Sequence, residues 1–288
     1  MKVLILGGEG MIGSNLAIEL SNKLEIASTH YFKNTSRFNN VKQYNYINAY
    51  DIQSIIKTTV DFSPNIIINC IGIVKQKVNS GMEKDLIYLN SLFPHQLKLI
   101  CELKNIKLIL LSTDCVFSGQ KGNYFENDIT DGNDIYGRTK ILGEISDSKN
   151  VLTIRISTIG LELNSRKGLI EWFLNQKGNI NGYENAIYTG FTISELSRIL
   201  FNVIVNFPYL NGLYHISSEP INKYNLLSSI KNLINKNDIK INKDNIFFCD
   251  RSLNSDKFKI ETGYNPPSWS DMLTELSYNI LERDKNGK

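Results

Sequence analysis

Tyr136 and Lys140 stand four residues apart near the middle of the 288-residue chain. In a helix this spacing places both side chains on one face, about one turn apart. A tyrosine hydroxyl has a reference pKa of ~10, and a cation beside it favours the phenolate and lowers that value. A tyrosine tuned in this way can donate a proton to a carbonyl oxygen or remove one from an alcohol. The spacing alone is also typical of a solvated helix face, so its meaning depends on the elements that position it.

A glycine-rich turn lies at the start of the chain. The apolar run 3–6 predicts a buried parallel strand, and the amphipathic stretch 15–20 predicts a helix. Between them stand Gly7, Gly10 and Gly13, which allow a tight turn and the close approach of a pyrophosphate to the helix N-terminus. The sequence therefore predicts the first unit of a dinucleotide-binding fold, and a turn without a ligand is the alternative.

The end of the second predicted strand, at 24–29, bears on the choice of cofactor. An acidic residue there would bind the ribose 2′-hydroxyl and favour NAD. The chain continues instead with His30 and Lys33, and Arg37 follows. Because cations could accept a 2′-phosphate, we predict NADPH as the cofactor, with NADH also usable. The alternative is that His30 and Lys33 are ordinary loop residues.

Further strands and helices alternate up to about residue 160. Strands are expected at 46–49, 65–72, 107–111 and 151–156, and helices over 52–60 and in the segment that contains Asn90. This alternation predicts an α/β protein with a Rossmann-type, doubly wound parallel sheet. Thr113 follows the strand at 107–111, and the carboxyl ends of parallel strands form the ligand-binding edge of such a sheet. Thr113 should therefore converge with Tyr136 and Lys140, and we interpret Asn90 as a buried polar residue tied to the same site.

After about residue 160 the alternation changes. We expect a helix around 169–174, a loop at 182–183, a helix over 193–205, a strand at 212–216 and two further helices. A smaller domain made of these pieces would cover the sheet edge and supply the substrate pocket. The predicted organisation is an NAD(P)-binding Rossmann domain of residues 1–160 with part of 185–215, and a smaller C-terminal α/β substrate-binding domain of residues 161–184 and 216–288.

Composition argues against several classes of protein. Net charge is +3 and the basic residues are dispersed, so there is no electrostatic footprint for nucleic acid. The four cysteines and three histidines show no metal-ligand spacing, and we expect no protein-built metal site. We see neither a signal peptide nor a run of ~18 apolar residues that could span a membrane. These features predict a cytoplasmic protein with reduced cysteines.

With these features in register, the chain resembles the extended short-chain dehydrogenase/reductases, and within them the dTDP-4-dehydrorhamnose reductase branch. The segments that carry the resemblance are 112–119 (STDCVFSG), 124–128 (YFEND) and 135–144 (IYGRTKILGE), followed more loosely by 155–157 (RIS), 212–215 (GLYH) and 251–258 (RSLNSDKF). They extend the resemblance over almost the whole chain.

The resemblance implies a reductase that acts on the C4 keto group of a nucleotide-linked 4-keto-6-deoxysugar in surface-glycan synthesis. Tyr136 would donate the proton, Lys140 would bind the nicotinamide ribose and tune Tyr136, and Thr113 would hold the substrate carbonyl. The predicted cofactor contacts, besides Tyr136 and Lys140, are Gly7, Gly10, Met11, Ile12, His30, Lys33, Asn48, Ala49, Cys70, Ile71, Gly72 and Asn90. The predicted substrate contacts are Val74, Asp114, Cys115, Trp172, Tyr188 and Arg251. A homodimer is compatible with this assignment.

The sequence departs from the family pattern at Cys115, where tyrosine is common, and over 69–76, where the family has an alanine-rich turn and an acidic stretch. This pattern is closer to relatives that reduce UDP-linked 4-keto sugars, including 2-acetamido sugars, so the nucleotide could be UDP or dTDP. Related epimerase-reductases carry a cysteine at the position of Cys115 as the epimerising base, and Lys167 and Lys177 are candidates for its acid partner. The simpler interpretation is a small residue that makes room in the pocket.

A second functional class also fits these motifs. The same branch includes a regulatory subunit of methionine adenosyltransferase, which keeps the fold and much of the motif set. Thr113, Tyr136 and Lys140 are all present in this chain, but their presence does not exclude a non-catalytic NADP-binding subunit. We favour the enzyme.

Overall fold

Seven strands form one parallel sheet at the centre of the protein. The computed structural model describes residues 1–33, 38, 40–162 and 166–285. The strand order is β10-β6-β5-β4-β1-β2-β3, and every neighbouring pair is parallel. The strands are β1 (Lys2–Leu6), β2 (Glu25–Thr29), β3 (Val41–Tyr44), β4 (Ile66–Asn69), β5 (Lys107–Thr113), β6 (Val151–Ile156) and β10 (Gly212–His215). This arrangement confirms the predicted Rossmann-type α/β fold.

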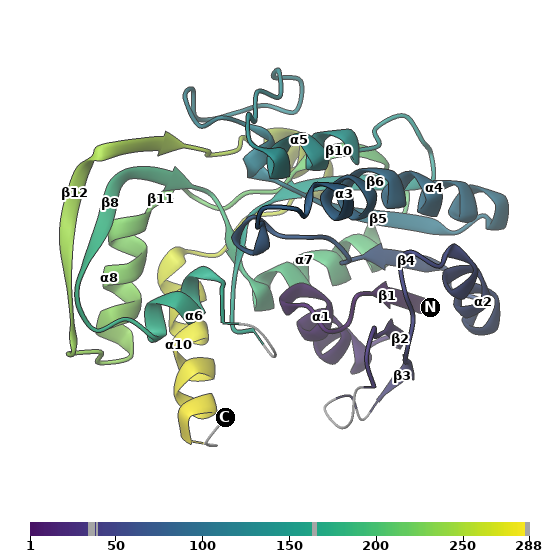
Figure 1. Cartoon of the computed structure of the whole chain (residues 1–288), viewed down its shortest axis with the longest axis horizontal. Coiled ribbons are helices and arrows are strands. Elements are labelled where there is room, and N and C mark those ends of the chain that lie inside the picture. Colours follow the sequence, from purple (N-terminus) through teal and green to yellow (C-terminus); the bar gives the residue numbers. More distant parts are fainter. Residues whose placement is uncertain (34–37, 39, 163–165, 286–288) are drawn as a thin grey trace.

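Helices cover both faces of this sheet (Figure 1). One face carries α1 (Met11–Ser21) and α7 (Ile193–Asn206), and the other carries α2 (Ile52–Phe62), α3 (Glu83–Leu86), a π-helical turn η2 (Ile87–Leu92), α4 (Phe93–Lys104) and α5 (Ile135–Leu142). Successive side chains of a strand point to opposite faces. Thus Val3 and Ile5 pack in the core cluster beneath α1 and α7, whereas Leu4 and Leu6 pack in the cluster beneath α2 and α4.

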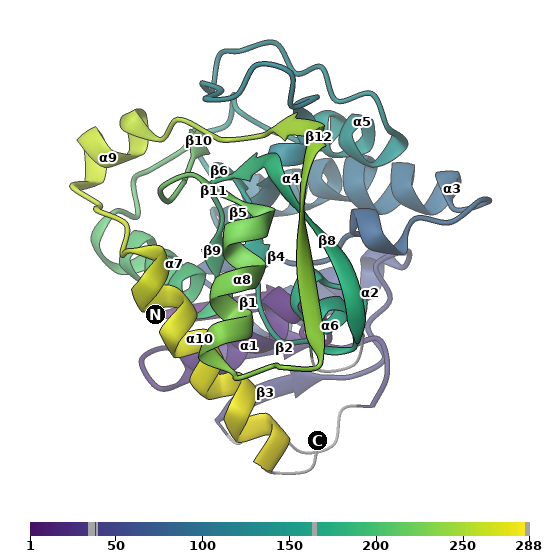
Figure 2. The same ribbon diagram turned by 90° about the vertical axis from the view of Figure 1, so that its left-hand side faces the viewer.

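A second, smaller sheet extends to one side of the large sheet. Its strand order is β11-β8-β12, with β12 parallel to β8 and β11 antiparallel. Figure 2 shows the two long strands beside α8. The elements of this region are β7 (Thr158–Ile159), α6 (Leu169–Leu174), β8 (Gly178–Tyr188), β9 (Phe191–Thr192), β11 (Ile221–Asn222), α8 (Lys223–Leu233), β12 (Ile239–Asp250), α9 (Asp256–Thr262) and α10 (Trp269–Lys285). Ile170, Leu227 and Leu276 belong to a separate apolar cluster at its centre.

Two predicted elements are wrong, and the described part of the chain after β10 contains three helices and the unpredicted strand β12 where two helices were expected. The third strand is Val41–Tyr44 and not 46–49, because Tyr46 adopts a positive φ of 62° that ends the extended chain. The expected loop at 182–183 lies inside β8. Gly182 is there for close packing and not for a turn, since a Cβ on it would lie 2.7 Å from Ile241 and 2.8 Å from Tyr224. The division into two domains stays a prediction.

None of the helices in the described part of the chain combines the length and the apolar character that a membrane crossing requires. Over the same ranges, no three His, Cys, Asp or Glu side chains gather so that they could hold a metal ion.

A buried ion pair joins the ends of three adjacent structural elements. Arg155 on β6 is 4% exposed, and its Nε and Nη2 donate to the two carboxylate oxygens of Glu144 at 2.8 and 2.7 Å. The Ser112 hydroxyl on β5 donates to the same carboxylate at 2.5 Å. Arg155 Nη1 lies 3.1 Å from Nε2 of His215 on β10, whose Nδ1 is 3.0 Å from the Tyr124 carbonyl oxygen. These contacts assign the neutral imidazole with its proton on Nδ1.

This environment predicts an acid-dependent loss of stability. Burial, and then Arg155, lower the pKa of His215 from its ordinary 6.5 to about 3. Between these values the unfolded chain binds the extra proton, so the free energy of unfolding rises with pH and is lost as the pH falls from about 6.5 towards 3. Urea unfolding at pH 6.5 and 4.5 should show His215→Gln losing about 2 kcal/mol less than the wild type. The exposed His95→Gln is the control, and equal losses in wild type and His215→Gln would contradict the assignment.

Candidate active site

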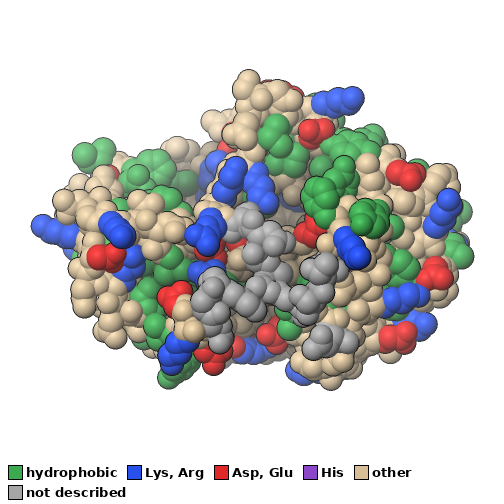
Figure 3. Space-filling view, turned by 60° about the horizontal axis from the view of Figure 1, so that its bottom comes forward, with side chains coloured by type: hydrophobic (Ala, Val, Ile, Leu, Met, Phe, Trp, Pro, Cys, Tyr) green, Lys and Arg blue, Asp and Glu red, His purple; other side chains and the backbone are tan. Residues whose placement is uncertain are grey.

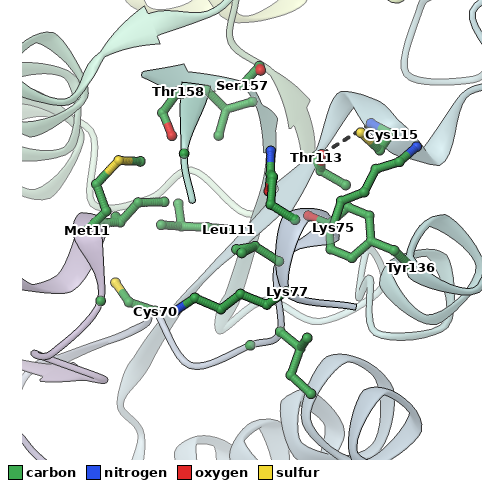
Figure 4. Close-up of a pocket in the computed structure, with 18 of the residues that line it drawn as sticks. Met11, Cys70, Lys75, Lys77, Leu111, Thr113, Cys115, Tyr136, Ser157 and Thr158 are labelled. Carbon is green, nitrogen blue, oxygen red and sulfur yellow. Dashed lines mark hydrogen bonds between the residues drawn. The ribbon is translucent and has the colours of Figure 1, made fainter. Parts of the chain in front are cut away.

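The carboxyl ends of β1, β4, β5 and β6 border a cleft of about 300 Å³. Gly10, Met11 and Ile12 line one end of it, and Thr113, Asp114 and Cys115 line the other. Figure 4 shows Met11 and Cys70 across the cleft from Thr113, Cys115 and Tyr136. Figure 3 views the molecule from the side of α1 and α6, where Lys and Arg side chains gather around a central hollow.

Tyr136 and Lys140 lie one turn apart on α5 and both line the cleft, as expected. The Lys140 ammonium donates to the Leu111 carbonyl oxygen at 2.8 Å, and burial lowers its pKa to about 8. The pKa of Tyr136 is raised above its usual value, chiefly by burial and then by Cys115. Lys140 is therefore not lowering the pKa of Tyr136 here, because its ammonium is turned to the strand. A protonated phenol is the form that a proton donor needs.

Thr113 ends β5 beside this tyrosine. Its hydroxyl donates to Asp114 Oδ1 at 3.1 Å and accepts from the backbone N–H of Cys115 at 3.1 Å. The Thr113 hydroxyl lowers the pKa of Tyr136, against the larger rise that burial causes. Asp114, which accepts the hydrogen bond from Thr113, is itself buried, with 7% of its surface exposed.

The glycine turn brings β1 and α1 together at the opposite end of the cleft. Gly7 has a φ of +86°, and a Cβ on Gly13 would lie 2.2 Å from the Gly7 carbonyl oxygen. Gly10 is the N-cap of α1 and has no side chain to cap the helix. The first N–H groups of a helix lack intrahelical acceptors and form a natural site for a phosphate. The turn therefore fits a dinucleotide, with Met11 and Ile12 beside it.

Not all predicted cofactor contacts reach the cleft. Those that line it are Gly10, Met11, Ile12, Cys70, Ile71, Gly72 and Asn90, together with Tyr136 and Lys140. Gly7 shapes the turn without lining the cleft. Asn48 and Ala49 are also outside the lining; Asn48 Oδ1 accepts from the Tyr50 N–H at 3.0 Å, and Ala49 is 8% exposed.

His30 does not present a cation to the cofactor site, which corrects that part of the prediction. It is 1% exposed, its Nε2 lies 2.8 Å from the Ser28 hydroxyl, and burial lowers its pKa. Lys33 is exposed, and Arg37 lies outside the described residues. Glu9 was not predicted from the sequence. Its carboxylate accepts from the Phe32 N–H at 2.7 Å and so lies beside the segment that follows β2.

Asn90 supports the wall of the cleft from the π-helical turn. It is 1% exposed; its Oδ1 accepts from the Ile73 N–H at 2.9 Å and its Nδ2 donates to the Ile73 carbonyl at 3.0 Å. The Asn90 side chain thus binds both backbone groups of Ile73, as a neighbouring strand would, and it fixes the segment that follows β4. Asn90 is thus buried and lines the cleft, and its role in a cofactor site stays a prediction.

At the substrate end, Val74, Asp114 and Cys115 line the cleft, but Trp172, Tyr188 and Arg251 do not. Trp172 is 39% exposed on α6, whereas Tyr188 is 3% exposed in the core of the smaller sheet. Arg251 reaches the site indirectly, because its Nη1 donates to the Cys115 sulfur at 3.6 Å.

Three cationic residues of the cleft were not predicted from the sequence. Lys75, Lys77 and Lys223 line it. Figure 4 shows Lys77 extending toward Cys70 and Lys75 extending toward Cys115. Lys75 and Lys77 belong to a short 3₁₀ turn, η1 (Lys75–Lys77). They cluster with Lys223 although about 150 residues separate the two chain segments. No local sequence pattern predicts a contact between segments so far apart.

The environment of Cys115 opposes a role as a base. Burial, and then Asp114, raise the pKa of its thiol to about 12. A thiolate is the form that abstracts a proton, and it is disfavoured here at neutral pH. Of its two candidate partners, Lys167 lines the cleft and Lys177 does not.

Comparison with known proteins adds three findings. The model of the RmlD substrate binding domain family matches residues 1–277. Methionine adenosyltransferase 2 subunit beta from Rattus norvegicus is 23% identical over 246 residues, which cover 81% of this chain and 72% of that protein.

Two solved structures show the fold. The dTDP-4-dehydrorhamnose reductase from Bacillus anthracis in complex with NADP has a TM-score of 0.78 and 17% identity, covering 96% of this chain and 99% of that chain. The Bordetella bronchiseptica enzyme WbmG in complex with NAD and UDP has a TM-score of 0.78 and 17% identity, covering 99% and 95%.

Alanine substitutions at Gly10 and Gly13 should have different effects. A Cβ on Gly13 would meet the backbone of Gly7 at 2.2 Å, whereas a Cβ on Gly10 has its nearest neighbour at 3.6 Å. Gly13→Ala should therefore destabilise the free protein by about 1–3 kcal/mol. Gly10→Ala should leave its unfolding temperature unchanged but remove most of the stabilisation by NADPH, because the methyl group enters the cleft. Thermal unfolding with and without NADPH measures both, and equal stabilisation of Gly10→Ala and wild type would contradict the proposed site.

Proposed function

Because the chain belongs to the RmlD substrate binding domain family, we propose that it is an NAD(P)H-dependent reductase of the C4 keto group of a nucleotide-linked 4-keto-6-deoxysugar. The observation that carries this proposal is the placement of Thr113 and the Tyr136 phenol at one end of a cleft whose other end is a glycine turn at a helix N-terminus. Both a proton donor and a dinucleotide site thus face one space.

The residues divide the reduction between them. Bound NADPH would supply the hydride to C4, and the chain supplies the proton and the orientation. Tyr136 donates its phenolic proton to the carbonyl oxygen, so that the C=O becomes a CH–OH group. Thr113, whose hydroxyl donates to Asp114 in the free protein, would hold the substrate carbonyl beside the phenol. Lys140, whose ammonium donates to the Leu111 carbonyl in the free protein, would bind the nicotinamide ribose.

The cofactor proposed is NADPH, with NADH also used. Lys33 at the exposed end of β2 favours a 2′-phosphate, whereas the Glu9 carboxylate beside Phe32 favours a free 2′-hydroxyl. The solved relatives hold NADP in one case and NAD in another. The ratio of kcat/KM for the two reduced cofactors measures which of the two residues dominates.

The substrate proposed is a UDP- or dTDP-linked sugar, including 2-acetamido UDP sugars. Cys115 leaves more room at the sugar end of the cleft than the tyrosine common in the family. A relative of the same fold is in complex with UDP. The cations of the cleft fit the diphosphate that such substrates carry.

A non-catalytic subunit is the second candidate. It is favoured by one observation, the 23% identity to methionine adenosyltransferase 2 subunit beta over 81% of this chain. The two candidates differ in hydride transfer. The enzyme oxidises NADPH when a 4-keto nucleotide sugar is added, and the subunit binds NADPH without turnover.

Tyr136→Phe should separate chemistry from binding. Loss of the phenolic proton should lower kcat by about 100-fold or more, since general acid catalysis contributes roughly 10²–10⁴. The affinity for NADPH should change less than about twofold, because the ring remains in place. NADPH consumption with UDP- and dTDP-linked 4-keto sugars measures the rate, and fluorescence titration measures the affinity. Survival of most of the activity in Tyr136→Phe would show that another group supplies the proton.

Cys115→Ala tests the epimerase alternative. With a thiol whose pKa is raised to about 12, we expect reduction without proton exchange at carbons next to the keto group. The variant should keep kcat within about threefold, and neither protein should incorporate deuterium at C3 or C5 in D₂O. Mass spectrometry of the product makes the measurement. Deuterium uptake by the wild type that disappears in Cys115→Ala would establish epimerisation instead.

A further inference from the structure

Lys223 lines the cleft from an element far along the chain from the other lining residues. It is the first residue of α8, and its neighbour Asn222 caps that helix by accepting from the Asn225 N–H at 2.7 Å. The backbone of Lys223 is therefore fixed at the point where α8 meets the cleft. The N-terminus of a helix carries a partial positive charge, which adds to the charge of the side chain.

The side chain of Lys223 rests on an aromatic platform. Its Nζ lies 3.4 Å from the centre of the Tyr188 ring. Tyr188 is 3% exposed, and its hydroxyl is one of the buried polar groups that have no hydrogen-bond partner among the described residues. The Tyr188 ring is held in this position because it also packs in the apolar cluster of the smaller sheet.

Apart from the Tyr188 ring, the Lys223 ammonium has no partner among the described residues. In the described ranges it makes no hydrogen bond and no salt bridge. Two other cations of the cleft differ in this respect: Lys140 donates to the Leu111 carbonyl, and Lys75 pairs with Asp134 at 2.6 Å. Burial lowers the pKa of Lys223 to about 8, and Asp114 opposes this shift.

An unpaired cation held in a low-dielectric site is costly. A side chain as long as lysine can normally avoid this cost by turning its ammonium to solvent. The Tyr188 platform and the capped helix instead hold Lys223 in the cleft, so the cost is offset when an anion binds. The charged or titratable groups that raise the pKa of Lys223 are Asp114, Cys115 and Cys249. Of these, Asp114 and Cys115 line the Thr113 end of the cleft and not the glycine turn.

Resting on the proposed function, we propose that Lys223 is a specificity-determining residue that binds an anionic oxygen of the nucleotide-sugar substrate. Its place beside Asp114 and Cys115 assigns this oxygen to the substrate, because the phosphates of the dinucleotide belong to the turn at Gly10. Two sources share this chemistry. They are the diphosphate of the nucleotide and an acidic substituent of the sugar.

Lys223→Met removes the charge and keeps most of the apolar volume over Tyr188. Lys223→Arg keeps the charge and can also stack on the ring. Lys231→Met is the matched control, since it removes the same charge from the same helix eight residues, or about 12 Å, further along α8 and does not line the cleft. All three variants are compared with the wild type in unfolding temperature and in affinity for NADPH, which should stay within about twofold.

The experiment measures dissociation constants by calorimetry for UDP, dTDP, and a pair of UDP sugars with and without a carboxylate on the sugar. Lys223→Met should weaken at least one of these ligands by about tenfold or more, as expected for loss of a charged hydrogen bond. Lys223→Arg should recover much of the loss, which a merely structural role would not explain. If Lys223→Met binds UDP and dTDP more weakly, Lys223 contacts the diphosphate. If it binds only the carboxylated UDP sugar more weakly, Lys223 contacts the carboxylate of the sugar.

The proposal is overturned if Lys223→Met binds every probe as tightly as Lys231→Met does, or if the wild type binds none of them. These binding measurements need no turnover. A Lys223 effect on binding in a protein that reduces no 4-keto sugar would therefore leave the anion site standing and reject the reductase. Conversely, a wild type that reduces the sugar, with an unchanged KM in Lys223→Met, would reject the role of Lys223 alone.

Discussion

The buried pair of Glu144 and Arg155 is the interaction on which the geometry of the active site depends. Glu144 stands just beyond the end of α5, and its carboxylate is bonded to Arg155 on β6 and to Ser112 on β5. One side chain thus ties the helix that carries Tyr136 to the strand that carries Thr113. Removing one partner of such a pair is strongly destabilising, because the other charge is left buried and unpaired. The reacting groups are held in register by a contact that takes no part in the chemistry.

The cleft combines cationic residues in its walls with a neutral proton donor. Lys75, Lys77 and Lys223 belong to its walls, whereas Tyr136 and Cys115 are shifted by burial toward their neutral forms. This separation suits a reaction in which the cofactor and the substrate are both anionic and the transferred proton must stay on the phenol until the carbonyl arrives. Binding energy and proton donation therefore come from different residues, and each can be changed without the other.

The sequence predicted most of the sheet and the three central residues, because these depend on local signals. Apolar runs gave the strands, and the positions of Thr113 at a strand end and of Tyr136 and Lys140 on one helix face followed from simple geometry. The errors arose where tertiary packing overrides such signals. Gly182 resembles a turn residue but lies in a crowded strand pair. The strand β12 was not predicted because it is rich in Lys, Asn and Asp. His30 is buried against the glycine turn. Lys223 was missed because its cleft exists only after distant segments meet.

Gly143 shows how far the catalytic helix is bound to its neighbour. A Cβ at this position would lie 2.0 Å from the carbonyl oxygen of Asn90 and 3.4 Å from the ring of Pro94, so the end of α5 sits directly against the π-helical turn. The two segments are packed tightly together although about 50 residues separate them in the chain. A chimera that grafts the helix of Tyr136 from a relative would have to carry the segment around Asn90 with it, and recombination between related chains is constrained to cross over outside this pair.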